Sequence, residues 1–140
     1  MTQDILDALL AGAEKPSRYI GAEVNSIHKA RPDVRFLLAF PDTYEVGMSH
    51  LGLQILYAVL NALPDVAGER CFAPWPDREQ QMRLRQLPLT SLESNSTMAD
   101  FDIIGFSLQY ELSYTNMLNM LDMGGIPLLS SERLNHHPLI

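Results

Sequence analysis

The stretch VRFLLAFPDTYEVGMSHLG, residues 34–52, contains the signals that decide the fold. Residues 34–40 are apolar apart from one arginine, which is typical of a strand buried on both faces of a parallel sheet. A short acidic turn then leads to Gly47. Ser49 is a suitable N-cap for a helix over residues 49–63, which a proline follows. The stretch therefore predicts a strand, a turn and a helix, the repeating unit of α/β folds.

The same alternation continues along the chain. Further strands are predicted over residues 70–74, 87–92 and 101–108, and further helices over 2–13, 77–86 and from Ser113 or Thr115 to Gly124. Strands that alternate with helices indicate a parallel sheet with right-handed crossovers. We expect a flavodoxin-like (Rossmann-like) doubly wound sheet of strand order 2-1-3-4-5. The final residues, HHPLI, look like the beginning of its fifth strand, so the sheet would be truncated there.

Two units are expected. Residues 1–32 would form an N-terminal helix and a connecting segment with a short strand through YIGAEV (19–24), and residues 33–140 would form the α/β domain. Two of its helices carry apolar residues at helical spacing, which we expect to pack on the sheet. These residues are Leu51, Ile55, Leu56, Val59, Leu60 and Leu63 in the first helix, and Tyr114, Met117, Leu118 and Leu121 in the last.

Charge and hydropathy restrict the partners. The net charge is −7 and the pI about 4.9, which disfavours nucleic acid or an anionic membrane held by bulk charge. No apolar run approaches the roughly 20 residues of a membrane helix, and the N-terminus lacks the basic start and apolar centre of a secretory signal. We therefore expect a cytoplasmic protein.

Cys71 is the only cysteine. A single thiol excludes an intrachain disulfide. Iron–sulfur clusters and structural zinc sites generally need several Cys or His ligands at fixed spacing, and the sequence has no such pattern. Because Cys71 lies in the apolar stretch RCFAPW, we expect a small buried residue rather than a nucleophile.

The turn after the first strand is the first candidate site, because ligands of open parallel sheets bind at the carboxyl ends of strands. Asp42 and Glu45 supply carboxylates, Gly47 permits close approach of a ligand, and free amide groups near Ser49 can bind an anion. Tyr44 occupies the middle of this turn. An ordinary βα turn with a helix cap accounts for the same residues.

A second candidate follows the strand predicted over residues 101–108. Ser107, Gln109 and Tyr110 are polar side chains where a strand meets a loop, and they fit either ligand binding or loop and capping chemistry. The stretch FAPWPD (72–77) fits an aromatic wall or partner surface, although a packed loop is favoured. The motifs GxGxxG, GxxxxGK[ST] and GxSxG are absent, so a standard dinucleotide fold and hydrolysis by this chain are poorly supported.

Two motifs resemble those of cobalamin-binding domains. The turn resembles their DxHxxG motif with Tyr44 in place of histidine, and Ser107 matches the serine of their SxL motif with Gln109 replacing leucine. Longer blocks resemble the N-terminal cobalamin-binding-like domain of a family of radical SAM proteins. These blocks are FPDTYEVGMSHLGLQILY (40–57), FAPWPD (72–77), SLES (91–94) and DIIGFSLQYELSYTNMLNML (102–121).

The resemblance implies a cofactor and a partner. Cobalamin would lie over the carboxyl edge of the sheet and be presented to a downstream radical SAM domain of the same protein, where a CxxxCxxC motif binds the iron–sulfur cluster and S-adenosyl-L-methionine. A neutral phenol, with a pKa near 10, is a poor cobalt ligand, so Tyr44 implies cobalamin without a protein histidine ligand. Gly47 would approach the corrin, Ser107 the nucleotide tail, and Asp42 would cap the turn.

A second hypothesis is a degenerate domain that binds no cobalamin and serves as a docking or dimerisation module. Its crevice would be filled by its own side chains, for which Tyr44, Met48 and Tyr110 are the candidates. An exposed edge of the sheet would favour a homodimer. Under both hypotheses the chain alone is not catalytic, and the chemistry belongs to the full-length radical SAM enzyme.

Overall fold

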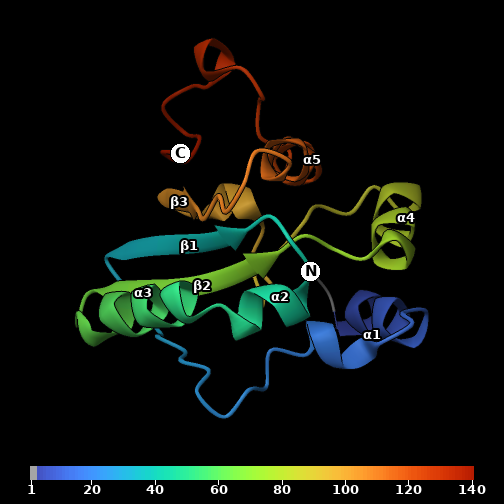
Figure 1. Ribbon diagram of the computed structural model, residues 1–140, viewed down its shortest axis with the longest axis horizontal. Helices are drawn as coiled ribbons and strands as arrows, with labels where there is room; N and C mark the ends of the chain where they lie inside the picture. Colours follow the sequence, from blue (N-terminus) through green and yellow to red (C-terminus); the bar gives the residue numbers. More distant parts are fainter. Residues whose placement is uncertain (1–2) are drawn as a thin grey trace.

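The computed structural model describes residues 3–140, with side chains from residue 5 onward. Figure 1 shows a parallel sheet, in the order β2-β1-β3, with helices packed on both faces. The elements are α1 (Gln3–Ala11), η1 (Pro16–Tyr19), β1 (Val34–Phe40), α2 (Tyr44–Ser49), α3 (Leu51–Ala62), β2 (Val66–Phe72), α4 (Pro76–Leu84), η2 (Met98–Asp100), β3 (Ile103–Phe106), α5 (Ser113–Met123) and η3 (Ser130–Glu132). The predicted class, a doubly wound α/β fold, is confirmed.

β1 is the central strand and has the predicted bounds. It pairs in parallel with β2 and with β3, so both of its edges are paired, and a hydrophobic core covers each of its faces. Successive side chains of a strand point to opposite faces. Leu37 and Ala39 accordingly enter one hydrophobic core, whereas Leu38 and Phe40 enter the other. The nearly continuous apolar run is the consequence of burial on both sides.

The two cores belong to different helices. The larger core receives side chains from α1, α4 and α5, and its members include Leu9, Met82, Met98, Met120 and Leu121. The smaller core receives side chains from α2 and α3, and its members include Leu53, Tyr57 and Phe72. The right-handed crossovers expected of parallel strands thus distribute the helices over two layers.

The helix predicted over residues 49–63 is wrong at its start. The turn after β1 is already helical from Tyr44, and α2 ends at Ser49. His50 is extended, with φ −82° and ψ 107°, and its ring nitrogen Nδ1 accepts from the Leu53 amide. His50 is therefore the N-cap of α3, while the Ser49 hydroxyl donates to the Val46 carbonyl oxygen.

The predicted buried faces of α3 and α5 are also wrong in part. Leu53 and Tyr57 are the buried residues of α3, and in α5 the buried apolar ones are Met120, Leu121 and Met123. Tyr114 and Leu118 are exposed by 56% and 44%. The exposed apolar residues of α3 are Leu51, Ile55, Leu56 and Val59, and Leu63 just beyond the helix is exposed as well. Both helices carry apolar residues on more than one face, so spacing alone did not identify the face on the sheet.

No strand forms over residues 87–92. The amides there bond in different directions, with Leu89 donating to the Met123 carbonyl oxygen and Leu92 to that of Arg70. Only an isolated antiparallel bridge, between Thr90 and Thr97, is present. The segment is apolar because Leu89 is buried in the larger core and Leu92 in the smaller one.

Further boundaries also differ from the predictions, and β3, at Ile103–Phe106, is shorter than the predicted 101–108. Residues 19–24 form no strand, since η1 ends at Tyr19 and bends follow it. β2 begins at Val66, and α4 begins at Pro76 after Trp75, so Asp77 lies inside the helix and does not cap it. The helix predicted over residues 2–13 is α1, whose expected first residue lies outside the described residues.

The last residues join the sheet beside the strand that was expected as their neighbour. Leu139 pairs in parallel with Ile103 of β3, and this position is the fourth rather than the fifth because residues 87–92 form no strand. The Leu139 amide donates to the Asp102 carbonyl oxygen, and the Ile104 amide donates to the Leu139 carbonyl oxygen. Across residues 3–140, no helix is both long and apolar enough to cross a membrane.

Candidate functional site

A shallow crevice of about 100 Å³ lies at the carboxyl ends of β1 and β3. Four of the candidate residues line it together: Asp42, Ser107, Gln109 and Tyr110. Phe40, Pro41 and Val46 add apolar surface, and His50 and Ser113 complete the lining. The fold therefore brings the ends of two segments far apart in the sequence to one edge of the sheet, where open α/β sheets bind ligands.

His50 connects the two sides of this crevice. Its Nε2 lies 3.0 Å from the Gln109 Oε1, and its ring lies 5.2 Å from that of Phe40. Since Nδ1 accepts from the Leu53 amide, this arrangement requires Nε2 to carry the proton and donate to Gln109. Asn116 adds a second link, donating to the Pro41 carbonyl oxygen at 3.0 Å. The crevice is thus held by contacts among its own residues.

Tyr44 points away from the crevice. Its hydroxyl donates to Glu23 Oε1 at 2.7 Å, and its ring meets that of Phe72 edge-on at 5.6 Å. Burial and the hydrogen bond to the Glu23 carboxylate raise the pKa of Tyr44 to about 12. The phenol is therefore neutral and already bonded to a protein group.

Glu45 and Gly47 do not line the crevice either. Glu45 contacts the N-terminal segment, and Gly47 packs against Phe72 of β2. Glu45 accepts from Arg18 Nε at 2.7 Å; burial alone would raise its pKa, but the Arg18 hydrogen bond and nearby cations lower it. A Cβ on Gly47 would come within 2.2 Å of a Phe72 ring carbon. The Phe72 ring therefore fills the space that a side chain at position 47 would need, and this packing explains the glycine without a ligand.

A buried charged network next to Tyr44 was missed by the sequence predictions. Arg70 is 1% exposed, and its Nε donates to Glu93 Oε1 at 2.7 Å while its amide donates to Glu93 Oε2 at 2.7 Å. Its Nη2 lies 3.4 Å from Glu23 Oε2, and its guanidinium lies 4.4 Å from the centre of the Tyr57 ring. The sequence signal that could have revealed this network was the charged pair Glu69-Arg70 inside an otherwise apolar strand.

This network is structural in character. Burial raises the pKa of Glu93 against the opposing attraction of Arg70. The pair is fully enclosed and internally satisfied, so no part of it is free for a ligand. Within the described residues, no group of three or more His, Cys, Asp or Glu side chains could hold a metal ion.

The fold and the crevice define a doubly wound α/β domain with its ligand edge at the ends of β1 and β3. The family described as "Radical SAM proteins, N-terminal" matches residues 52–140, more than half of the chain, and the chain belongs to this family. Neither the curated proteins nor the solved structures include a match.

Proposed function

We propose that this chain is the N-terminal accessory domain of a radical SAM protein and that the exposed face of α3 docks on the downstream radical SAM domain. One observation carries the proposal, a stripe of large aliphatic side chains on the outer face of α3. These are Leu51, Ile55, Leu56, Val59 and Leu63, each between 46% and 71% exposed. We call this set the α3 stripe.

The spacing of the α3 stripe makes it one continuous surface. Leu51, Ile55 and Val59 follow one another at four-residue intervals, so they lie on one side of the helix. A helix of this length presents a strip roughly 18 Å long. Contiguous apolar surface of this kind marks interaction sites, and a helix face that enters a groove is a common mode of recognition.

The family supports the choice of occupant. Its members are the N-terminal parts of radical SAM proteins, so the downstream domain is tethered to the same chain. Tethering gives an effective concentration that can reach the millimolar range. Even a weak apolar contact between this chain and the downstream domain is then formed in most molecules.

Binding of the downstream domain, supplied as a separate chain, tests this proposal. Ile55→Ser combined with Val59→Ser should weaken association at least about tenfold, since two buried aliphatic side chains contribute well over 1.4 kcal/mol. Leu84→Ser is the matched control, because Leu84 is 78% exposed on α4 and outside the stripe. Unchanged affinity in the double variant would refute the proposal.

A second copy of the chain is the competing occupant. Sedimentation of the isolated chain, with and without the double substitution, separates the two. A dimer that the substitution dissociates, together with unchanged binding of the downstream domain, would assign the α3 stripe to dimerisation and overturn the docking proposal.

Cobalamin presentation is the alternative function, and the crevice is the feature that favours it. Ser107, Gln109 and Tyr110 line that crevice, but the Tyr44 hydroxyl and the face of Gly47 are occupied by protein groups and do not fit a corrin. We derive no step through cobalt. Absorption titration with hydroxo- and methylcobalamin should show no saturable change; saturable binding that Ser107→Phe weakens would favour the cobalamin carrier instead.

A further inference from the structure

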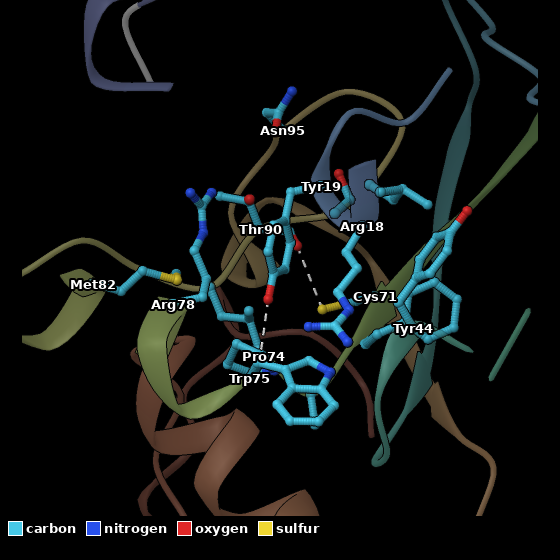
Figure 2. Close-up of a pocket in the computed structure, with 15 residues that line it drawn as sticks. Arg18, Tyr19, Tyr44, Cys71, Pro74, Trp75, Arg78, Met82, Thr90 and Asn95 are labelled. Carbon is cyan, nitrogen blue, oxygen red and sulfur yellow. Dashed lines mark hydrogen bonds between the residues drawn. The ribbon is translucent and has the colours of Figure 1, made fainter. Parts of the chain in front are cut away.

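A second pocket lies between η1, the loop after β2 and the start of α4. Its cavity volume is about 40 Å³. A buried water needs roughly 10–15 Å³ in this measure, so the space suits a group of a few heavy atoms. Figure 2 shows Arg18 and Tyr19 of η1 together with Trp75 and Arg78 from the start of α4 around this space.

Arg78 is a buried cation, and one nitrogen of its guanidinium is unsatisfied by the residues that the structure describes. It is 5% exposed, and its Nη1 has no hydrogen-bond partner among the side chains and backbone that the structure describes. Its guanidinium lies 4.8 Å from the centre of the Tyr19 ring. Burial lowers the pKa of Arg78. An unpaired buried charge is costly, and the cost falls when an anion binds.

Two further donors of the same pocket are also unused. Arg18 is 4% exposed and donates through Nε to Glu45, but its Nη1 has no partner. Its guanidinium lies 4.2 Å from the centre of the Trp75 ring, and the Trp75 Nε1 is likewise buried without an acceptor. Buried donors are normally hydrogen-bonded, so three orphans around one cavity indicate a missing acceptor.

The acidic groups nearby do not supply that acceptor. The Asp77 carboxylate interacts with the Arg78 and Arg18 guanidinium groups only over a distance, and its Oδ2 accepts from the Glu14 amide at 2.7 Å. Its Oδ1 is a buried acceptor that is itself unused. Glu45 is engaged by Arg18 Nε and lies 3.9 Å from Lys15. Among the described residues, no carboxylate lies within 4 Å of the Arg78 guanidinium.

We propose that this pocket binds a small oxyanion, a free phosphate or a free carboxylate, with Arg78 as its charge partner and with Arg18 Nη1 and Trp75 Nε1 as further donors. Guanidinium groups are suited to oxyanions because their donors match the spacing of carboxylate and phosphate oxygens. The stacked rings of Tyr19 and Trp75 hold the two arginines in place and keep water away. The site shares no lining residue with the α3 stripe and is independent of docking.

Titration of phosphate and of acetate into the chain, at constant ionic strength, tests the site. Trp75 is the only tryptophan, so its indole N–H resonance reports on the pocket directly. We expect a saturable shift of that resonance and a rise in Tm with anion concentration. Arg78→Met should reduce affinity at least about tenfold, and Arg78→Lys, which keeps the charge, should reduce it less.

Arg31→Met is the matched control, because it removes the same charge from an exposed position just before β1, at the opposite edge of the sheet. It should leave affinity unchanged. Saturation by phosphate alone or by acetate alone assigns the chemical class of the ligand. The proposal is overturned if neither anion saturates, or if the Arg78 variants bind as the wild type does. Should Arg78→Met not fold, Arg78→Lys decides the question.

Discussion

Gly47 is the residue at which packing and ligand binding make opposite demands. The resemblance to cobalamin-binding domains assigns its open face to a corrin. In the fold that face meets Phe72 and Phe40, whose ring carbons would lie 2.2 Å and 3.2 Å from an added Cβ. The glycine is therefore explained by the close approach of α2 to β2.

Gly47→Ala should consequently lower the free energy of unfolding by about 1–3 kcal/mol, the usual cost of overpacking. Ser49→Ala, two residues along the same helix at an exposed position, should change it by less than about 0.5 kcal/mol. Urea denaturation of both variants measures the difference. Equal stability of Gly47→Ala and the wild type would mean that Phe72 does not pack there.

Asp77 should make stability depend on pH in the acid range. The Glu14 amide, and to a lesser extent other backbone groups, lower the pKa of its carboxyl. Because the folded pKa lies below the unfolded value of about 3.9, the charged form stabilises the fold above that value. The contribution is lost as pH falls through the folded pKa.

Asp77→Asn keeps an acceptor for the Glu14 amide but removes the charge. We expect this variant to be less stable than the wild type at pH 7, with the difference shrinking as pH falls below about 3.9 and through the folded pKa. Thermal melts over this pH range measure the difference. A difference in Tm between the two proteins that stays constant with pH would show that the charge contributes nothing to stability.

At the scale of elements, the pair Arg70–Glu93 attaches the segment after α4 to the edge of β2. The Leu92 amide donates to the Arg70 carbonyl oxygen, and Glu93 accepts from both the amide and the Nε of Arg70. The segment over residues 91–96 thus protects the outer edge of β2 without forming a strand.

Arg70→Met should cost about 3–5 kcal/mol, because Glu93 is left as an unpaired buried charge. Adding Glu93→Leu should restore part of that loss, so the two changes are not additive. Arg83→Met is the control: Arg83 pairs with Glu79 and Asp122 at an exposed site, and its loss should cost at most about 1 kcal/mol. Chemical denaturation of the wild type, of Arg70→Met, of Glu93→Leu and of the double variant gives the four stabilities of the cycle, and Arg83→Met is measured beside them. Strict additivity of the two buried changes would exclude direct coupling.

Elements differ in how far their sequence predicts them. β1 could be predicted to the residue because a strand buried on both faces leaves a continuous apolar run. The break at His50 could not, since Ser49 is a good N-cap by type and the imidazole takes that role only through its bond to the Leu53 amide. The orphaned donors of Arg18 and Arg78 depend on contacts far apart in sequence.

At the scale of the whole molecule, the outer side of β3 is covered only by a short contact with Leu139. The figure places the C-terminus beside β3, away from α3 (Figure 1). Two backbone hydrogen bonds, involving Asp102 and Ile104, hold this contact. The edge of the sheet beside β3 and the α3 stripe are therefore different surfaces.

Leu139→Pro removes the amide that donates to Asp102. We expect a loss of about 1 kcal/mol and faster hydrogen exchange at the Ile104 amide, whose acceptor is the Leu139 carbonyl oxygen. Exchange at the Leu37 amide, in the centre of the sheet, serves as the internal reference. Equal protection of Ile104 in both proteins would mean that the contact is not formed in solution.

The sequence by itself determined the class of fold, the central strand and the edge of the sheet at which polar side chains gather. Strand and helix periodicities are local, and the carboxyl ends of strands lie at the same end of a sheet whenever the strands are parallel. It also determined that Cys71 is buried, because Cys71 lies in a mostly apolar stretch, RCFAPW.

Only the tertiary structure decided which faces of α3 and α5 remain exposed, where Tyr44 points, and which cations lack partners. A helix with apolar residues on more than one side can pack on a sheet in more than one rotation, and the choice depends on the whole core. The Arg78 pocket likewise exists only because η1 and the start of α4, which are distant in sequence, meet across the end of β2. The spacing of apolar and polar residues within one segment does not predict its contacts with a segment that is distant in the sequence.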